Sequence, residues 1–232
     1  MGSGLQNQLG RRLGSLRAIH RFDGLVPQLV ALPTNKVREN FAGDHHSFAL
    51  TADGSVWACG RNNNGQTGIP VTDAGRRLAD KISVPIPTRV SALQGYKVRT
   101  LTGGPYHSIA CTEEGQVLAW GRYDSGQVRL DLDNVPGEHF AKDPRGRRVE
   151  LSVPTVVPEL EAIHVAAGID WCVAITAKGQ DYSWGFSSDY RTGLGMLGEV
   201  VKPRPMTGIR DSIRWAGSGR TFRLVIGRVE GR

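Results

Sequence analysis

Short runs of alternating apolar and polar residues recur along this chain, and glycine-rich turns separate them. Residues 47–51 alternate small or polar side chains with apolar ones, residues 52–54 are Ala-Asp-Gly, and residues 56–59 are again mostly apolar. Alternation with a period of two indicates a half-buried strand, and an Asp-Gly pair between two such runs is typical of a tight turn with positive φ. The segment is therefore predicted to form a β-hairpin.

The same hairpin pattern is repeated. Residues 42–61 align without a gap on residues 103–122, a third copy covers residues 167–185, and a fourth begins at Ala216 but breaks off after one strand. A glycine-rich segment follows the first hairpin at residues 60–68 and is echoed at 185–193 and 2–10, and long proline-containing connectors then lead to the next copy. Repeats of about 50 residues or more, built from short strands with glycine and tryptophan marks, favour a β-propeller over a solenoid. A β-sandwich with accidental self-similarity is the alternative, which gap-free matches of this length disfavour.

The expected fold class is all-β, with one partial propeller over residues 1–232. Its repeats are expected at about 2–59, 60–120, 121–184 and 185–227, and residues 228–232 are expected to be a tail or a cloning scar.

Composition narrows the class of protein further. The chain has 232 residues, a formal charge of +7, 39% apolar and 22% charged residues, which fits a globular domain and excludes a disordered tail or collagen. Three cysteines lie far apart without a Cys-x-x-Cys pair, which indicates a reducing compartment and no zinc site. Since neither a signal peptide nor an apolar run of about 18 residues is present, we expect a soluble intracellular protein with no membrane contact.

The repeat resembles that of a known family. The pattern Gly104-x-x-His107-Ser108-Ile109-Ala110-x-Thr112-x-x-Gly115-x-Val117-x-x-Trp120-Gly121, together with Gly60-x-x-x-x-Gly65-Gln66-x-Gly68, resembles the repeat of the regulator of chromosome condensation, the guanine-nucleotide exchange factor for the small GTPase Ran. Residues 4–12 with the insertion after them, and residues 184–193, point to its fungal forms. The resemblance covers about residues 2–227.

This resemblance implies a seven-bladed propeller of roughly twice the present length. The chain looks like its C-terminal half, with about four of seven blades, and the N-terminal half, which carries a protruding β-wedge in the family, is a predicted partner. A closed ring of four blades is conceivable, but an open arc whose edge strands expect partners is favoured.

Exchange factors perform no covalent chemistry, so we expect no catalytic residue, cofactor or metal. The polar residues of the loop before each hairpin are the candidates for GTPase binding, because these loops share one face of a propeller. With the two arginines near the ends, they are Arg11, Asp44, His45, His46, His107, Asp170 and Arg220. His107 and Arg11 match positions implicated in exchange in the family. A structural role, with hydrogen bonds to a neighbouring loop, is the alternative for His46 and His107, and Trp57, Trp120 and Trp184 are expected to pack inside or between blades.

Arginine clusters lie in the predicted surface connectors. They are candidates for nonspecific attraction to DNA phosphates or acidic histone surfaces, in keeping with the family's nuclear, chromatin-associated location. These candidates are Arg76, Arg77, Arg145, Arg147 and Arg148. Ordinary solvated loops are the alternative.

Three function classes remain open. The leading one is the C-terminal half of a Ran exchange factor, which acts by stabilising the nucleotide-free GTPase. The second is a propeller interaction module of the same superfamily with another partner, such as a ubiquitin-ligase or membrane-traffic scaffold. The third is a propeller enzyme, which is disfavoured because Asp44, His45 and His46 form the single acid/base cluster on a predicted loop and have no cysteine nucleophile beside them.

Overall fold

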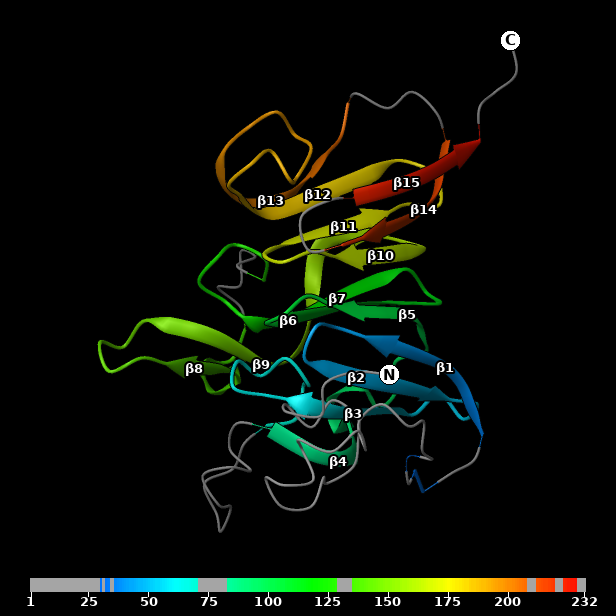
Figure 1. Ribbon diagram of the computed structural model, residues 1–232, viewed down its shortest axis with the longest axis vertical. Coiled ribbons are helices and arrows are strands. Elements are labelled where there is room, and N and C mark those ends of the chain that lie inside the picture. The colour runs from blue at the N-terminus through cyan, green and yellow to red at the C-terminus, as the bar shows by residue number, and fades with distance from the viewer. Residues whose placement is uncertain are drawn as a thin grey trace, which may run out of the picture.

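Four antiparallel β-sheets follow one another along the chain in the computed structural model, and they are stacked from one end of the molecule to the other (Figure 1). The structure describes residues 30, 32–33, 36–70, 83–128, 135–207, 212–219 and 223–228, and every structural statement below refers to these residues.

The first three sheets are meanders in which each strand pairs with the next one in sequence, apart from one added strand. The first sheet contains β1 (Val37–Ala42), β2 (His46–Thr51), β3 (Val56–Arg61) and β4 (Ser83–Arg89). The second contains β5 (Val98–Gly103), β6 (His107–Thr112), β7 (Gln116–Arg122), β9 (Arg148–Glu161) and, outermost, β8 (Phe140–Lys142). The third contains β10 (His164–Ala167), β11 (Trp171–Ile175), β12 (Asp181–Ser187) and β13 (Gly198–Pro205).

The fourth sheet has two described strands, β14 (Ser212–Ser218) and β15 (Arg223–Arg228), and short 3₁₀ turns lie at Ser91–Leu93 and Gly137–His139. None of the helical segments in the described part of the chain is long and apolar enough to cross a membrane.

The predicted hairpins are confirmed. In the first, Leu50 pairs with Val56 and His46 with Gly60, and Gly54 occupies the turn with φ of 80°. The equivalent pairs are His107 with Gly121 in the second sheet and Trp171 with Gly185 in the third. The expected repeat boundaries near residues 60, 121 and 185 fall at the ends of β3, β7 and β12, so each sheet continues past them to its outer strand.

The hydrophobic core lies between the sheets. One cluster joins the first and second sheets and includes Leu50, Leu101, Leu118 and Trp120. A second cluster joins the second and third sheets, and a smaller third cluster joins the third and fourth. Each sheet is therefore stabilised by apolar burial against its neighbours in the stack.

A similar set of side-chain to main-chain hydrogen bonds connects the first sheet to the second and the second to the third. The indole Nε1 of Trp120 donates to the main-chain oxygen of Gln66 at 3.0 Å, and the Ser108 hydroxyl donates to the same oxygen at 2.8 Å. One interface later, Trp184 donates to the Gln127 oxygen at 3.0 Å, and the Cys172 thiol, at the position of Ser108, lies 3.7 Å from it. The glycine-rich loop after each hairpin thus accepts polar contacts from the following sheet.

These observations confirm the all-β class and a partial propeller. Three complete sheets and a two-stranded fourth are described, and the first and last sheets lie at opposite ends of the stack rather than meeting in a ring (Figure 1). Trp120 and Trp184 are fully buried between sheets, as expected, whereas Trp57 is half-buried and lines a cavity of about 410 Å³ against the outer face of the first sheet.

Candidate functional site

The loops that precede the hairpins all lie at one end of the sheets, which we call the loop face. The residue before each second strand, which is His45, Tyr106 or Asp170, accepts a main-chain hydrogen bond from the residue after the glycine that ends the hairpin. The three bonds are Arg61 N to His45 O at 2.8 Å, Arg122 N to Tyr106 O at 2.9 Å and Phe186 N to Asp170 O at 2.7 Å. Each of the first three sheets therefore presents a loop residue and a strand-end residue side by side.

Charged and aromatic side chains from successive sheets meet on this face. We name the set formed by Arg61, Tyr106, Arg122, Asp124 and Asp170 the arginine–tyrosine array. The guanidinium carbons of Arg61 and Arg122 lie 5.9 and 5.4 Å from the ring centre of Tyr106, within range of a cation–π interaction. Arg122 also pairs with Asp124 (Nε to Oδ1, 2.5 Å) and lies 4.0 Å from Asp170.

The array bridges two sheet boundaries. Arg61 of the first sheet and Tyr106 of the second meet at one boundary, and Arg122 of the second and Asp170 of the third meet at the next. Burial raises the pKa of Asp170, and the nearby Arg122 charge opposes that rise. Since Arg122 and Asp170 are partly exposed, with side-chain exposures of 33% and 22%, the array offers preorganised charges to a partner surface.

His46 and His107 lie beneath this face and are fully buried. His46 Nε2 lies 2.7 Å from the Ser108 hydroxyl. Because the single proton of that hydroxyl goes to the Gln66 oxygen, His46 must donate from Nε2. Burial, with a smaller effect of the other histidine charges, lowers the pKa of His46 to about 3, and burial lowers that of His107 to about 4.

Two glycines allow this burial. A Cβ on Gly103 would lie 2.5 Å from His46 Nε2, and a Cβ on Gly104 would lie 2.7 Å from His107 Cε1. The contacts of His46 thus favour the structural role weighed above, and neither histidine reaches a partner directly from its present position.

The other predicted residues divide into three groups. Asp44 is exposed on the loop face, His45 is half-buried and accepts the main-chain hydrogen bond of Arg61, and Asp170 belongs to the array. Arg145 and Arg147 form the turn between β8 and β9, and Arg148 begins β9, so these three lie on a β-hairpin rather than in an irregular connector. Arg11, Arg76, Arg77 and Arg220 lie outside the described residues.

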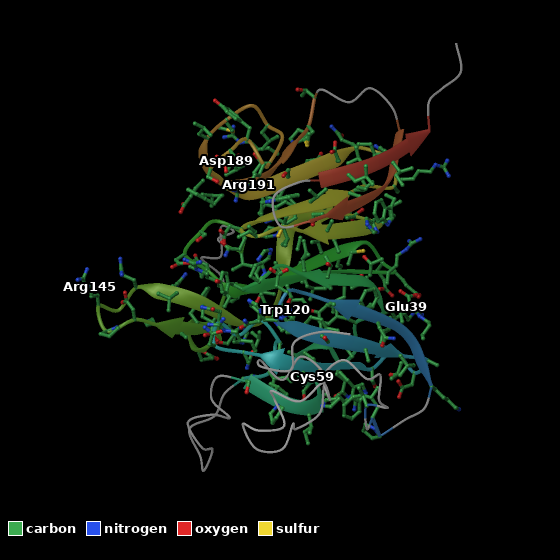
Figure 2. The ribbon with its side chains drawn as sticks, in the orientation of Figure 1. Glu39, Cys59, Trp120, Arg145, Asp189 and Arg191 are labelled. Carbon is green, nitrogen blue, oxygen red and sulfur yellow. The ribbon has the colours of Figure 1, made fainter. Side chains whose placement is uncertain are left out.

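Sequence reasoning missed Arg61 and Arg122 as site residues. The signal was present, because Gly60-Arg61 and Gly121-Arg122 occupy the same place in the first two repeats. The pairing of Arg191 with Asp189 (2.6 Å) on the same side of the molecule was missed as well (Figure 2).

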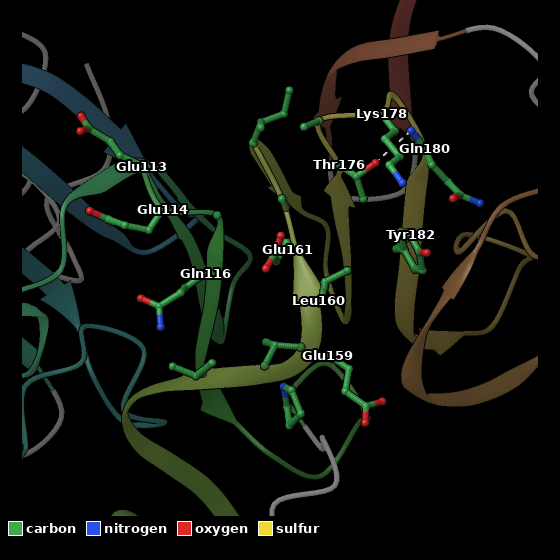
Figure 3. Close-up of a pocket in the computed structure, with 17 residues that line it drawn as sticks. Glu113, Glu114, Gln116, Glu159, Leu160, Glu161, Thr176, Lys178, Gln180 and Tyr182 are labelled. Atoms are coloured by element: carbon green, nitrogen blue, oxygen red, sulfur yellow. Dashed lines mark hydrogen bonds between the residues drawn. The ribbon is translucent and has the colours of Figure 1, made fainter.

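The opposite end of the sheets carries both acidic and basic side chains, among them Arg38 with Glu113 and Lys97 with Glu114. A groove of about 770 Å³ lies between the second and third sheets, where the hairpin turns 113–115 and 176–180 approach each other (Figure 3). Glu113, Glu114, Glu159 and Glu161 line it together with Lys178. Among the described residues, no group of three histidine, cysteine or acidic side chains could hold a metal ion.

A comparison with known protein families identifies the first two of these repeats. The model of the regulator of chromosome condensation (RCC1) repeat matches residues 41–66 and 98–127. Over 97% of its length the chain is 39% identical to Protein pim1 from Schizosaccharomyces pombe, and over 84% of its length it is 33% identical to Guanine nucleotide exchange factor SRM1 from Saccharomyces cerevisiae. It spans 41% and 38% of these two relatives.

The fold is similar to that of a solved relative. The crystal structure of Prp20p from Saccharomyces cerevisiae, a protein whose binding to Gsp1p and histones has been described, matches 99% of this chain with a TM-score of 0.85 and 28% identity. The match covers 51% of that structure. On its repeats, its sheets and these similarities, the chain belongs to the regulator of chromosome condensation (RCC1) repeat family.

Proposed function

We propose that this chain is the C-terminal half of a guanine-nucleotide exchange factor for the small GTPase Ran, and that the loop face binds the GTPase. The observation that carries the proposal is the arginine–tyrosine array, in which side chains of three successive sheets form one partly exposed charged surface. Similarity to SRM1, named as a guanine nucleotide exchange factor, and to Prp20p, which binds Gsp1p, supports it.

The activity needs no covalent step. By linkage, a protein that binds the nucleotide-free GTPase more tightly than the nucleotide-bound form weakens nucleotide binding by the same factor, and each 1.4 kcal/mol of preference corresponds to about tenfold. Arg61, Arg122 and Asp170, with Asp44 and His45 beside them, would make the contacts. The buried His46 and His107 would act as positioning residues that hold these loops.

Because the chain spans less than half of pim1 and SRM1, the full activity is assigned to this chain together with an N-terminal half. We further propose a nuclear, chromatin-associated location. The charge of +7, the arginine clusters and the histone binding described for Prp20p support this location.

The first test measures binding of nucleotide-free Ran and release of a fluorescent GDP analogue, with the chain alone and with the N-terminal half of pim1 added. Arg122→Ala and Tyr106→Ala should each weaken binding by about 30-fold, the size of an interface hot spot. Lys178→Ala, at the opposite end of the sheets, is the matched control and should change nothing. Equal binding by all variants, or no Ran binding by folded wild-type chain, would overturn the proposal.

A further inference from the structure

A β-hairpin projects from the second sheet beyond the loop face. Within β9, Leu151 and Glu150 pair on one side with Gly121 and Arg122 of β7, and on the other side with Phe140 and Ala141 of β8. Residues 142–148 therefore continue past the level of Arg122, by about 10 Å given the rise of a strand. Figure 1 shows this projection, and Figure 2 shows Arg145 at its tip, on the same side as Asp189 and Arg191 and opposite Glu39. We call residues 140–150 the basic hairpin.

The tip of the basic hairpin is held in one conformation. Asp143 accepts hydrogen bonds from the main-chain nitrogens of Arg145 and Arg147, both at 2.9 Å, and from Nε of Arg147 at 2.7 Å. Gly146 has a φ of 77°, which closes the turn. An arm with a fixed turn loses little conformational entropy when it binds, which favours a role in recognition.

The base of the hairpin is fixed by stacked side chains. Phe140 is buried, with Tyr123 edge-on at 5.3 Å between ring centres and the Arg148 guanidinium 4.2 Å from its ring centre. The arm is thereby anchored to the segment that follows Arg122, so its position relative to the arginine–tyrosine array is set by the fold.

The charge of the arm is concentrated at its exposed end. Arg147 pairs with Asp143 and Arg148 stacks on Phe140, whereas the side chains of Lys142 and Arg145 are exposed at the tip. A partner that rests on the loop face would meet these two cations at its flank. Complementary charges at such a rim steer association and raise the association rate.

We propose that the basic hairpin is a steering arm that contacts an acidic flank of the GTPase bound on the loop face, through Lys142 and Arg145. The inference rests on the proposed function and adds a second contact region to it.

Two observations favour a protein over nucleic acid at this arm. The adjoining face offers phosphates little net attraction, because Asp124 and Asp170 lie against Arg122 and Asp189 pairs with Arg191. Two available cations would also give a DNA salt dependence of only about −1.8 in logarithmic slope, too shallow to hold DNA firmly at physiological salt.

The test measures association and dissociation rates of nucleotide-free Ran with the full chain at about 0.05 and 0.5 M salt. In Lys142→Glu/Arg145→Glu the association rate at low salt should fall by about tenfold, while dissociation changes by less than about threefold and the difference shrinks at high salt. The matched control, Lys97→Glu/Lys178→Glu, makes the same charge change at the opposite end of the sheets and should leave the rates unchanged. Arg145→Ala, which keeps the main-chain bond to Asp143, should show a smaller effect in the same direction.

The outcomes separate the two proposals. If wild-type chain and the array variants behave as proposed above but Lys142→Glu/Arg145→Glu binds Ran at the wild-type rate, the steering arm is overturned alone. If the wild type binds no form of Ran, the proposed function and the arm fall together. If the double variant loses binding to a labelled DNA duplex but keeps its Ran kinetics, the arm serves nucleic acid and our inference is wrong.

Discussion

Acid should destabilise this protein through two buried histidines. His46 is fully buried at the interface of the first and second sheets, and His107 is fully buried near the interface of the second and third. In the folded protein the pKa of His46 is about 3 and that of His107 about 4, both below the ordinary value of 6.5. Below pH 6.5 the unfolded chain therefore takes up protons that the folded chain rejects. The stabilisation is complete above pH 6.5, is lost as the pH falls toward 4 to 3, and changes no further below that range.

The magnitude follows from the difference in proton uptake. Each pH unit below 6.5 costs about 1.4 kcal/mol for each histidine that stays neutral, so between pH 7.5 and 5 each should remove about 2 kcal/mol from the free energy of unfolding. The two together should remove about 4 kcal/mol, a large fraction of the stability of an ordinary domain.

Urea unfolding followed by tryptophan fluorescence at pH 7.5, 6 and 5 measures this dependence. His46→Gln and His107→Gln should each flatten the slope by the share of one histidine, whatever they cost at pH 7.5. His139→Gln is the matched control, because that residue lies in a 3₁₀ turn away from the sheet interfaces. If the two buried variants lose stability with acid as steeply as the wild type does, the assignment of this slope to the histidines is wrong.

Three further predictions concern the sheet interfaces. Ser108→Ala leaves the His46 Nε2 proton without its acceptor and should lower the free energy of unfolding by about 1–3 kcal/mol in urea titration; an unchanged midpoint would contradict the assigned proton position. Gly103→Ala places a Cβ against His46 and should cost about 1–3 kcal/mol, seen as a lower Tm, whereas wild-type Tm would mean that His46 moves freely. Burial raises the pKa of Cys59 to about 11, and Cys172 is completely buried. Iodoacetamide at pH 7.5 should therefore label these two thiols only in urea, and rapid labelling of the folded chain would refute the packing.

The sequence predicted the inner strands better than the outer ones. Alternation and the Asp53-Gly54 turn were sufficient for β2 and β3, because local pattern and tertiary burial agree there. The outer strands β4 and β13, and the part of β9 that continues past its pairing with β8, contain prolines, so these segments look like connectors. Proline is tolerated at a sheet edge, where its missing N–H need not pair, and this context is visible only once the sheets are built.

The candidate site was predicted in part for a related reason. The loop position of Asp44, His45 and Asp170 follows from the repeat. The position of His46 and His107 at the start of the following strand follows from it as well. That Arg61 reaches Tyr106, 45 positions further along the sequence, depends on the stacking of one sheet on the next. Nothing in a single repeat encodes that distance. The basic hairpin was likewise hidden, because its turn between Asp143 and Arg147 has the composition of a solvated loop.

The division of the core into separate clusters between neighbouring sheets has an elastic consequence. When each sheet packs only against its neighbours, the sheets themselves stay rigid, and bending of the stack is expected to occur at the interfaces between them. The arginine–tyrosine array crosses two of these interfaces, since Arg61 and Tyr106 belong to adjacent sheets and so do Arg122 and Asp170. A ligand bound to the array would restrict motion between the sheets that it contacts. Amide protons of those sheets should therefore exchange more slowly in its presence.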